Sequence, residues 1–301
     1  FTRGEWAALR ADTPLTLDLR MPDRQQRLSR LDVTMPPGLL ASLTAAPLCS
    51  SASASAGACP AATQIGTVTA LAGSGDRPLA LAGKVFFAEG TGTDTAALAM
   101  SVSAKVGSLD LGQLNLLAHA QILSNPLRMH IYTDPLPRYF HGIELNVRGL
   151  TLRLDRPGFI HNPSTCGASS LRALLTGVQG TVATSSPAIA VSGCRQMGFA
   201  PTLSAAAGGP GQNAVGSHPP FQVTITARDG DADMSATTVT LPSSLSIDLA
   251  RVGAQCPMAR FVARQCDKST IVGTAQATTS LLPDPVAGNA YLVSQKLGEL
   301  P

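Results

Sequence analysis

Cysteine is the residue type whose spacing in this chain most clearly predicts chemistry. The six cysteines form three pairs, separated by 10, 28 and 10 residues. No pair is a C-x-x-C motif and no histidine lies between its members, so the spacing does not fit a zinc site. Paired cysteines are typical of oxidising compartments, with six buried free thiols in a cytosolic protein as the alternative. We predict three local disulfides: Cys49–Cys59, Cys166–Cys194 and Cys256–Cys266.

A weaker candidate for chemistry is a calcium site formed by alternating carboxylates. Asp229, Asp231 and Asp233 could together face a hard cation such as calcium. The rest of the loop pattern is missing, because Met234 stands where a turn glycine belongs and Thr240 where a bidentate glutamate belongs. A solvated turn is the alternative interpretation. We expect no other metal site and no cofactor.

Histidine and aromatic residues show no arrangement specific to catalysis. The five histidines lack metal-ligand spacing, and no G-x-S-x-G, H-E-x-x-H or phosphate-loop motif occurs. His119 and His130 could meet across a hairpin, where we expect a solvated sheet face. Tyr132, Tyr139 and Phe140 are the one local concentration of aromatics, and packing is favoured over a ligand platform. We predict that the chain is not an enzyme, although sequence alone leaves a Ser/His/Asp triad open.

An internal repeat sets the domain organisation. The segment Val33–Pro36 matches Val239–Pro242 in type and order. Further along, the first cysteine pair matches the third, and Ile65–Thr67 matches Val272–Thr274. Matched cysteines and a matched Gly-Thr in one register are difficult to obtain by chance. We therefore predict three segments in the order a, b, a: residues 1–89, 90–204 and 205–301.

The boundaries of these segments carry two further expectations. Residues 205–220 are rich in glycine, proline and alanine, which predicts a linker or a long loop. No second b segment follows the second copy of a within these residues, so we expect unpaired strand edges around residues 271–277 and 289–293. We predict completion by a neighbouring subunit, by a continuation of the chain, or by strand addition.

Alternation of apolar and polar residues predicts antiparallel strands with one buried face. Clear examples are Leu15–Leu19, Leu98–Val102, Ile143–Val147, Leu150–Leu154 and Phe221–Ile225. Helical spacing is weak; its best case is Pro37–Ala46, with Ser243–Val252 as the counterpart. We predict an all-β fold of tandem antiparallel β-sandwich (Ig-like) modules stapled by disulfides.

Composition excludes several classes of protein. Charged residues make up 14% and the net charge is +3, too few and too scattered for a nucleic-acid interface, a coiled coil or a charged disordered chain. No apolar run approaches the roughly 18–20 residues of a membrane-spanning helix. The chain begins at Phe1 without a signal segment, which we interpret as a processed product. With the paired cysteines, this predicts an extracellular or cell-surface location.

Six short stretches carry a resemblance to a known family: Thr34–Leu39, Cys59–Pro60, Ile65–Gly66, Phe159–Cys166, Val191–Cys194 and Phe199–Leu203. They resemble the repeat of large secreted tandem-repeat proteins of high-GC bacteria, chiefly actinobacteria, which are mostly uncharacterised. The resemblance implies surface location and repetition, and it implies no particular chemistry.

Three classes of function remain, in order of preference. The first is a non-enzymatic extracellular structural protein, a cell-surface or filament subunit that associates with itself or with neighbouring subunits. The alternative is an adhesin or a glycan- or protein-binding module, which an exposed cluster of Tyr132, Tyr139 and Phe140 would favour. The third is a secreted hydrolase, which a cleft joining a serine, a histidine and an acid would favour.

Overall fold

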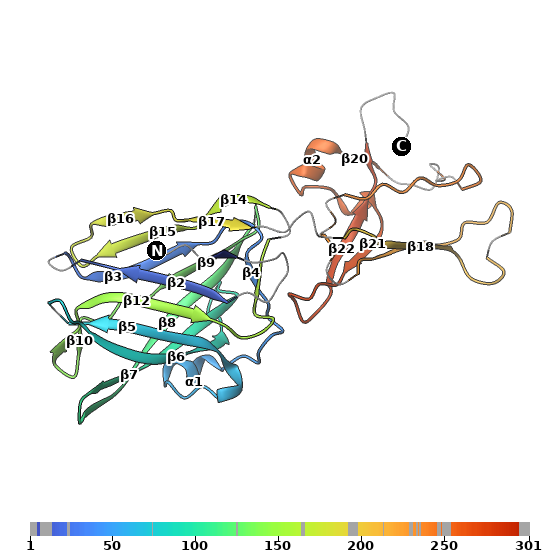
Figure 1. The fold of residues 1–301 in the computed structure, drawn as a ribbon. Coiled ribbons are helices and arrows are strands. Elements are labelled where there is room, and N and C mark those ends of the chain that lie inside the picture. Colours follow the sequence, from blue (N-terminus) through green and yellow to red (C-terminus); the bar gives the residue numbers. More distant parts are fainter. Residues whose placement is uncertain are drawn as a thin grey trace. The chain divides into compact units, whose positions relative to one another are not determined.

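The chain folds mainly into β-strands (Figure 1). The α-helices among the described residues have five residues each and are α1 (Ser51–Ser55) and α2 (Met258–Val262). The all-β, sandwich-like class predicted from the alternating pattern is therefore confirmed. The computed structural model describes residues 5–6, 14–22, 25–73, 75–124, 126–163, 166–191, 198–212, 214–228, 231–232, 234, 236–245, 248 and 254–294.

The chain divides into two compact units, unit 1 (Phe1–Asp233) and unit 2 (Met234–Pro301). Ten strands of unit 1 form one curled antiparallel sheet (Figure 1). Their order across the sheet is β16 (Val182–Ser185), β15 (Arg172–Gly177), β3 (Leu28–Thr34), β9 (Arg128–Thr133), β8 (Leu109–Leu123), β7 (Ala96–Val106), β6 (Leu79–Glu89), β5 (Gln64–Ala72), β12 (Val147–Leu154) and β2 (Leu15–Arg20).

Strands from the segments predicted as a and b pair with one another throughout this sheet. From segment a, β3 pairs with β9 and β15, β5 with β12, and β6 with β7. The predicted boundary between residues 89 and 90 lies in the hairpin that joins β6 to β7. The two segments therefore build one sheet together.

Outside a stretch of β6 and β7 that is buried on both faces, the strands of this sheet bury alternate side chains in one core, as their apolar–polar alternation predicts. For example, β9 buries Met129, Ile131 and Thr133 and leaves His130 and Tyr132 half-buried on its other face. Two apolar cavities in the core have volumes of about 30 and 40 Å³. These volumes admit water molecules and are far below those of small-molecule pockets.

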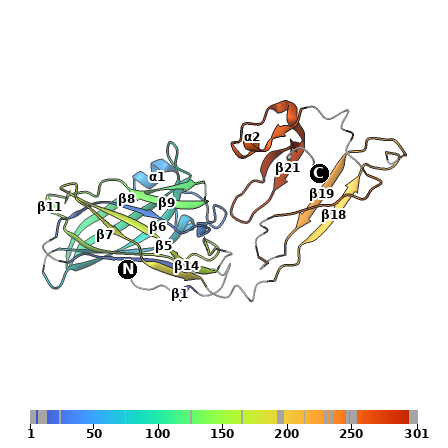
Figure 2. The same ribbon diagram turned by 90° about the horizontal axis from the view of Figure 1, so that it is seen from above.

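Shorter strands complete unit 1. β1 (Glu5–Trp6), β17 (Ala188–Val191) and β14 (Gly167–Ser170) form a three-stranded sheet. Three two-stranded sheets pair β4 (Leu40–Ala41) with β13 (Ile160–His161), β10 (Tyr139–Phe140) with β11 (Ile143–Glu144), and β18 (Thr202–Ala207) with β19 (Phe221–Thr226). The last pair is a hairpin (Figure 2), and its loop falls in the segment predicted as a linker or long loop.

The helix predicted over Pro37–Ala46 is wrong. Gly38 has a φ of +80°, a left-handed conformation that interrupts a right-handed helix. Beyond it, Leu40 and Ala41 form β4 instead, because their backbone pairs with β13. Of its predicted counterpart Ser243–Val252, the residues within the described part of the chain are not helical.

Unit 2 contains a smaller set of elements. Its strands are β20 (Cys256–Pro257), β21 (Ile271–Ala277), β22 (Val286–Tyr291) and β23 (Val293–Ser294), and a 3-10 helix, η3, covers Lys268–Thr270. β21 and β22 form an antiparallel hairpin, and β20 pairs with β23 in parallel. Among the described residues of this unit, Cys256 and Thr270 alone are buried.

None of the helices in the described part of the chain combines the length and the apolar character needed to cross a lipid bilayer.

Candidate functional site

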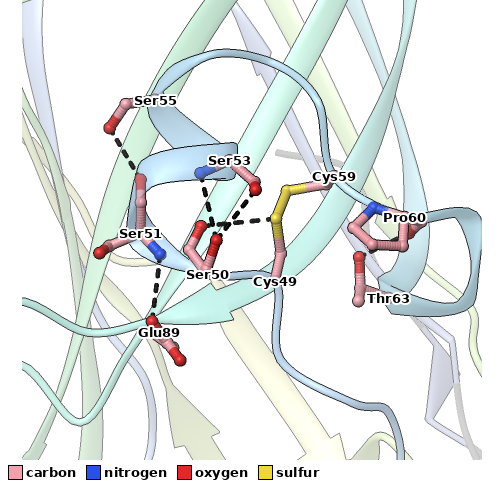
Figure 3. The surroundings of a disulfide bond; sticks show 9 residues. All are labelled: Cys49, Ser50, Ser51, Ser53, Ser55, Cys59, Pro60, Thr63 and Glu89. Carbon is pink, nitrogen blue, oxygen red and sulfur yellow. Dashed lines mark hydrogen bonds between the residues drawn. A yellow bond between two sulfur atoms is a disulfide. The ribbon is translucent and has the colours of Figure 1, made fainter.

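A disulfide closes the first of two similar elements in the chain (Figure 3). Cys49 and Cys59, with Cα atoms 5.4 Å apart, enclose α1. Ser50 caps this helix, because its hydroxyl accepts a hydrogen bond of 3.3 Å from the Ser53 N–H. At the start of the helix, the Ser51 N–H donates to the Glu89 carboxylate at 3.1 Å. The local sequence thus forms a short capped helix that is tied to the end of β6.

This first element covers the outer face of the ten-stranded sheet. The Cys49 N–H donates to the Phe87 carbonyl oxygen at 2.8 Å, and the Glu89 N–H donates to the Cys49 carbonyl oxygen at 2.9 Å. The helix and the disulfide then enclose a second small core beside β6 and β7, whose buried members are Cys49, Ala54, Phe86, Ala88, Ala97 and Ala99.

The second element, in unit 2, has the same order of parts. Cys256 and Cys266 form a disulfide with a Cα–Cα distance of 5.5 Å and enclose α2. A 3-10 helix follows each disulfide, η1 (Ala61–Thr63) in the first element and η3 in the second. A strand hairpin then follows, β5–β6 in the first and β21–β22 in the second.

Individual hydrogen bonds also coincide between the two elements. The Cys256 N–H donates to the Leu292 carbonyl oxygen at 2.8 Å, the same distance as in the bond from Cys49 to Phe87. Both hairpins have a register shift at the same place, two residues into their first strand. Each 3-10 helix ends at a threonine whose hydroxyl donates a hydrogen bond to the carbonyl oxygen three residues earlier. The distance is 2.7 Å for Thr63 and 2.6 Å for Thr270.

Burial separates the two elements. Ile65 is 1% exposed, whereas Val272 at the matching position is 54% exposed. Leu81 is 7% exposed, whereas its counterpart Val286 is 51% exposed. In unit 1, β5 and β6 each have a second strand neighbour, β12 and β7. Within the described residues, β21 and β22 pair only with each other, so this hairpin has two open edges and an exposed apolar face.

The third predicted disulfide lies partly outside the described residues. Cys166 is disulfide-bonded, and no described cysteine is free. Cys194, its predicted partner, falls in a part of the chain that is not described.

The calcium candidate involves one described carboxylate, since Asp229 and Asp233 lie outside the described residues. Asp231 is 3% exposed, and its Oδ1 accepts a hydrogen bond of 3.1 Å from Arg228 Nη2. The Ala200 N–H donates to its Oδ2 at 3.2 Å. The Arg228 hydrogen bond is the main cause that lowers the pKa of Asp231, and it outweighs burial. Both carboxylate oxygens of Asp231 therefore already accept hydrogen bonds from protein donors.

The predicted solvated sheet face holds a compact cluster of charged and aromatic groups. The ring of Tyr132 on β9 stacks between two imidazoles, 4.9 Å from His119 and 5.4 Å from His130. The His130 ring lies 3.0 Å from the Asp32 carboxylate of β3. His119 lies 2.7 Å from Asp94 through Nδ1 and 3.3 Å from an Asp134 oxygen through Nε2.

Asp94, which lies in the turn between β6 and β7, is the centre of this cluster and was not among the residues singled out from the sequence. Its side chain is 5% exposed. Burial opposes its ionisation, but hydrogen bonds from Tyr132 (2.9 Å), Gln121 (2.9 Å) and His119 outweigh burial and lower its pKa. The same bond to the Asp94 carboxylate, aided by burial, raises the pKa of Tyr132.

This cluster does not have the geometry of a Ser/His/Asp triad. Both ring nitrogens of His119 face carboxylates, so neither is placed against a hydroxyl nucleophile. No group of three or more His, Cys, Asp or Glu suited to a metal occurs within the described residues. The arrangement is a network of hydrogen bonds, ring stacking and close histidine–carboxylate contacts that joins β3, β8 and β9.

The three aromatics that a binding function would bring together have separate contacts. Tyr132 belongs to the cluster on β9, whereas Tyr139 and Phe140 lie on β10. Tyr139 is 53% exposed, with the Arg138 guanidinium 5.2 Å from its ring centre. Phe140 meets the His141 ring edge to face.

Comparison with protein-family models, with curated proteins and with solved structures gave no match to this chain.

Proposed function

We propose that the chain is a non-enzymatic extracellular structural protein, a cell-surface or filament subunit built of tandem β modules. The observation that carries the proposal is the recurrence of one disulfide-closed element, with its helix, its 3-10 helix, its hairpin and matching hydrogen bonds, at residues 49–89 and 256–294. Repetition of one structural unit along a chain is the usual way to build an extended assembly.

The chemistry of the chain supports an extracellular location. Two disulfides close loops of the same length, and Cys166 is also oxidised. Disulfides persist outside the cytoplasm, where thiols are not kept reduced. The low charged fraction, 14%, and the net charge of +3 argue against a nucleic-acid partner.

The interior of unit 1 supports a structural role over catalysis or small-molecule binding. The two cavities described above, about 30 and 40 Å³, are lined almost wholly by apolar side chains. Small-molecule sites are about tenfold larger and combine apolar walls with convergent polar groups. In this proposal the sheet is a rigid load-carrying body, and its function lies in contacts with other modules.

Location on the source cells tests this proposal directly. Antibodies against the purified chain are expected to label intact, unpermeabilised cells in electron micrographs and to decorate the wall or filaments. As a control, antibodies against a cytosolic protein should label only permeabilised cells. Labelling of the chain only after permeabilisation would contradict the proposal.

A further inference from the structure

The β21–β22 hairpin has two strand edges whose counterparts in unit 1 are paired. Residues Gly66–Ala72 of β5 pair with β12, and Gly83–Glu89 of β6 pair with β7. Both of these neighbours, β12 and β7, run antiparallel to the strand with which they pair, and both come from segment b. The matching edges of β21 and β22 have no such neighbour among the described residues. Unpaired edges of this kind are templates for another strand.

The hairpin also keeps the two-faced pattern of its counterpart. Its apolar residue Val286 occupies the position of buried Leu81. Polar residues remain on the opposite positions, where Thr274 and Asn289 replace Thr67 and Lys84. The exposed side that carries Val286 thus corresponds to the side of β6 that faces the core in unit 1, where residues of segment b are among the neighbours of Leu81.

A third observation concerns the segment that matches β3. In unit 1, β3 is held on both sides by strands of segment b, β9 and β15. Its counterpart is the stretch 234–240, and the described residues there have no regular structure. Among the described residues, this stretch has neither the strand structure of β3 nor b-type strand neighbours.

We propose that the β21–β22 hairpin is an acceptor site for a polypeptide segment of the b type. A strand like β7 would add antiparallel to the edge of β22, and a strand like β12 would add antiparallel to the edge of β21. This proposal rests on the tandem-module function proposed above, and it names the partner of the second module. Main-chain hydrogen bonds supply affinity in such strand addition, and alternate side chains supply specificity.

Register-specific cross-linking tests the acceptor site on the intact 301-residue chain. In unit 1, Ser101 of β7 lies opposite Lys84, whose counterpart is Asn289. We would combine Asn289→Cys in the chain with a synthetic peptide of residues 96–106 that carries Ser101→Cys. The matched control is the same peptide with Ser103→Cys, on the same strand face but two residues out of register. The expected disulfide yield is about tenfold higher for Ser101→Cys, because cysteines far from direct opposition cannot bridge.

A second peptide reports on strand addition itself. A labelled 96–106 peptide should bind the unmodified chain in fluorescence anisotropy, and its Met100→Pro variant should lose that binding, because proline cannot continue the ladder. Equal yields for both cysteine peptides, or equal binding of both labelled peptides, would overturn the acceptor site. Absence of binding would overturn it as well.

Self-pairing is the remaining outcome that contradicts the proposal. If Asn289→Cys chains cross-link to one another through β22 in the absence of peptide, the occupant is a second copy and not a b-type segment. These results are independent of the cell-labelling experiment. If the chain is located on the cell surface but does not bind the peptide, the acceptor site is contradicted and the proposed structural function is not.

Discussion

The two disulfide-closed elements have the same local structure and different surroundings. Ala54 of α1 and Phe86 of β6 are both buried in one cluster in unit 1. At the matching positions in unit 2, Phe261 packs edge to face on Tyr291 at 6.3 Å while remaining 45% exposed. Disulfide, helix and hairpin are thus formed by the element itself. Its burial depends on strands supplied by another segment.

The local structure of the element and its burial in a module therefore have different origins: the first comes from the element's own residues, and the second comes from strands of another segment. An isolated two-stranded hairpin is marginally stable in water, and the disulfide supplies part of the missing stabilisation in unit 2. In unit 1, the hairpin is part of a ten-stranded sheet with a common core. Substitutions at matched positions should therefore have unequal effects.

The largest expected effect comes from a matched pair of truncations in the two hairpins. Ile65→Ala should lower the free energy of unfolding of unit 1 by about 2–5 kcal/mol, because it leaves a cavity in a packed core. Val272→Ala should change the stability of unit 2 by about 0.5 kcal/mol or less, because the side chain is half exposed. Urea unfolding followed by amide exchange of peptides from each unit measures both. Similar losses in the two units would break the comparison.

Removal of each disulfide is the next largest effect. Each bond closes a loop with a sequence separation of 10, for which the chain-entropy argument gives about 3 kcal/mol. The double substitution Cys49→Ala, Cys59→Ala should destabilise unit 1 by that amount and expose the outer face of β6. Pulse proteolysis in urea reports the change.

Its matched variant, Cys256→Ala with Cys266→Ala, should unfold α2 and leave the unfolding of unit 1 unchanged. An equal shift of the unit 1 transition in both variants would show that the two units unfold as one, contrary to the comparison.

The smallest expected effect concerns pH and the Asp94 cluster, to which nothing in the described part of unit 2 corresponds. The pKa of Asp94 is lowered in the folded state from its usual 3.8, so its contribution to stability is present above that value and is lost as pH falls through the folded pKa. Tyr132→Phe removes one donor and should raise the pKa of Asp94. Acid unfolding of unit 1 should then begin at a higher pH.

Carbon-13 NMR titration of the Asp94 carboxyl group and circular dichroism against pH measure these changes. Tyr291→Phe is the control in unit 2, because the hydroxyl of Tyr291 accepts from the Asn289 amide at 3.5 Å and contacts no carboxylate among the described residues. An acid midpoint unchanged by Tyr132→Phe, or shifted equally by Tyr291→Phe, would contradict the role given to the cluster.

Period-two alternation was sufficient to predict strands such as Leu98–Val102 and Leu150–Leu154, because a half-buried strand must repeat every second residue. The helix inside the first disulfide loop escaped prediction, since its five residues are serine and alanine and carry no periodic apolar signal. Its one detectable signal was Ser50 at the N-cap.

The order of strands could not be predicted, because it depends on contacts between segments distant in sequence. The same reason explains why Asp94 was missed: its partners on β8 and β9 are 25 to 38 residues away in the chain. The two local disulfides, by contrast, needed only the copied spacing of their cysteines.

The distance along the chain between paired strands has a kinetic consequence. β2 pairs with β12, and β3 pairs with β9 and β15, so residues 15–34 acquire these strand neighbours only from residues 128–177. High contact order of this kind slows folding, because the entropy of closing long loops is lost before the contacts form. During synthesis, a nascent chain that has emerged only as far as Glu89 can form the β5–β6 hairpin and its disulfide. It cannot complete the ten-stranded sheet until the chain has emerged as far as Ser185, the end of β16.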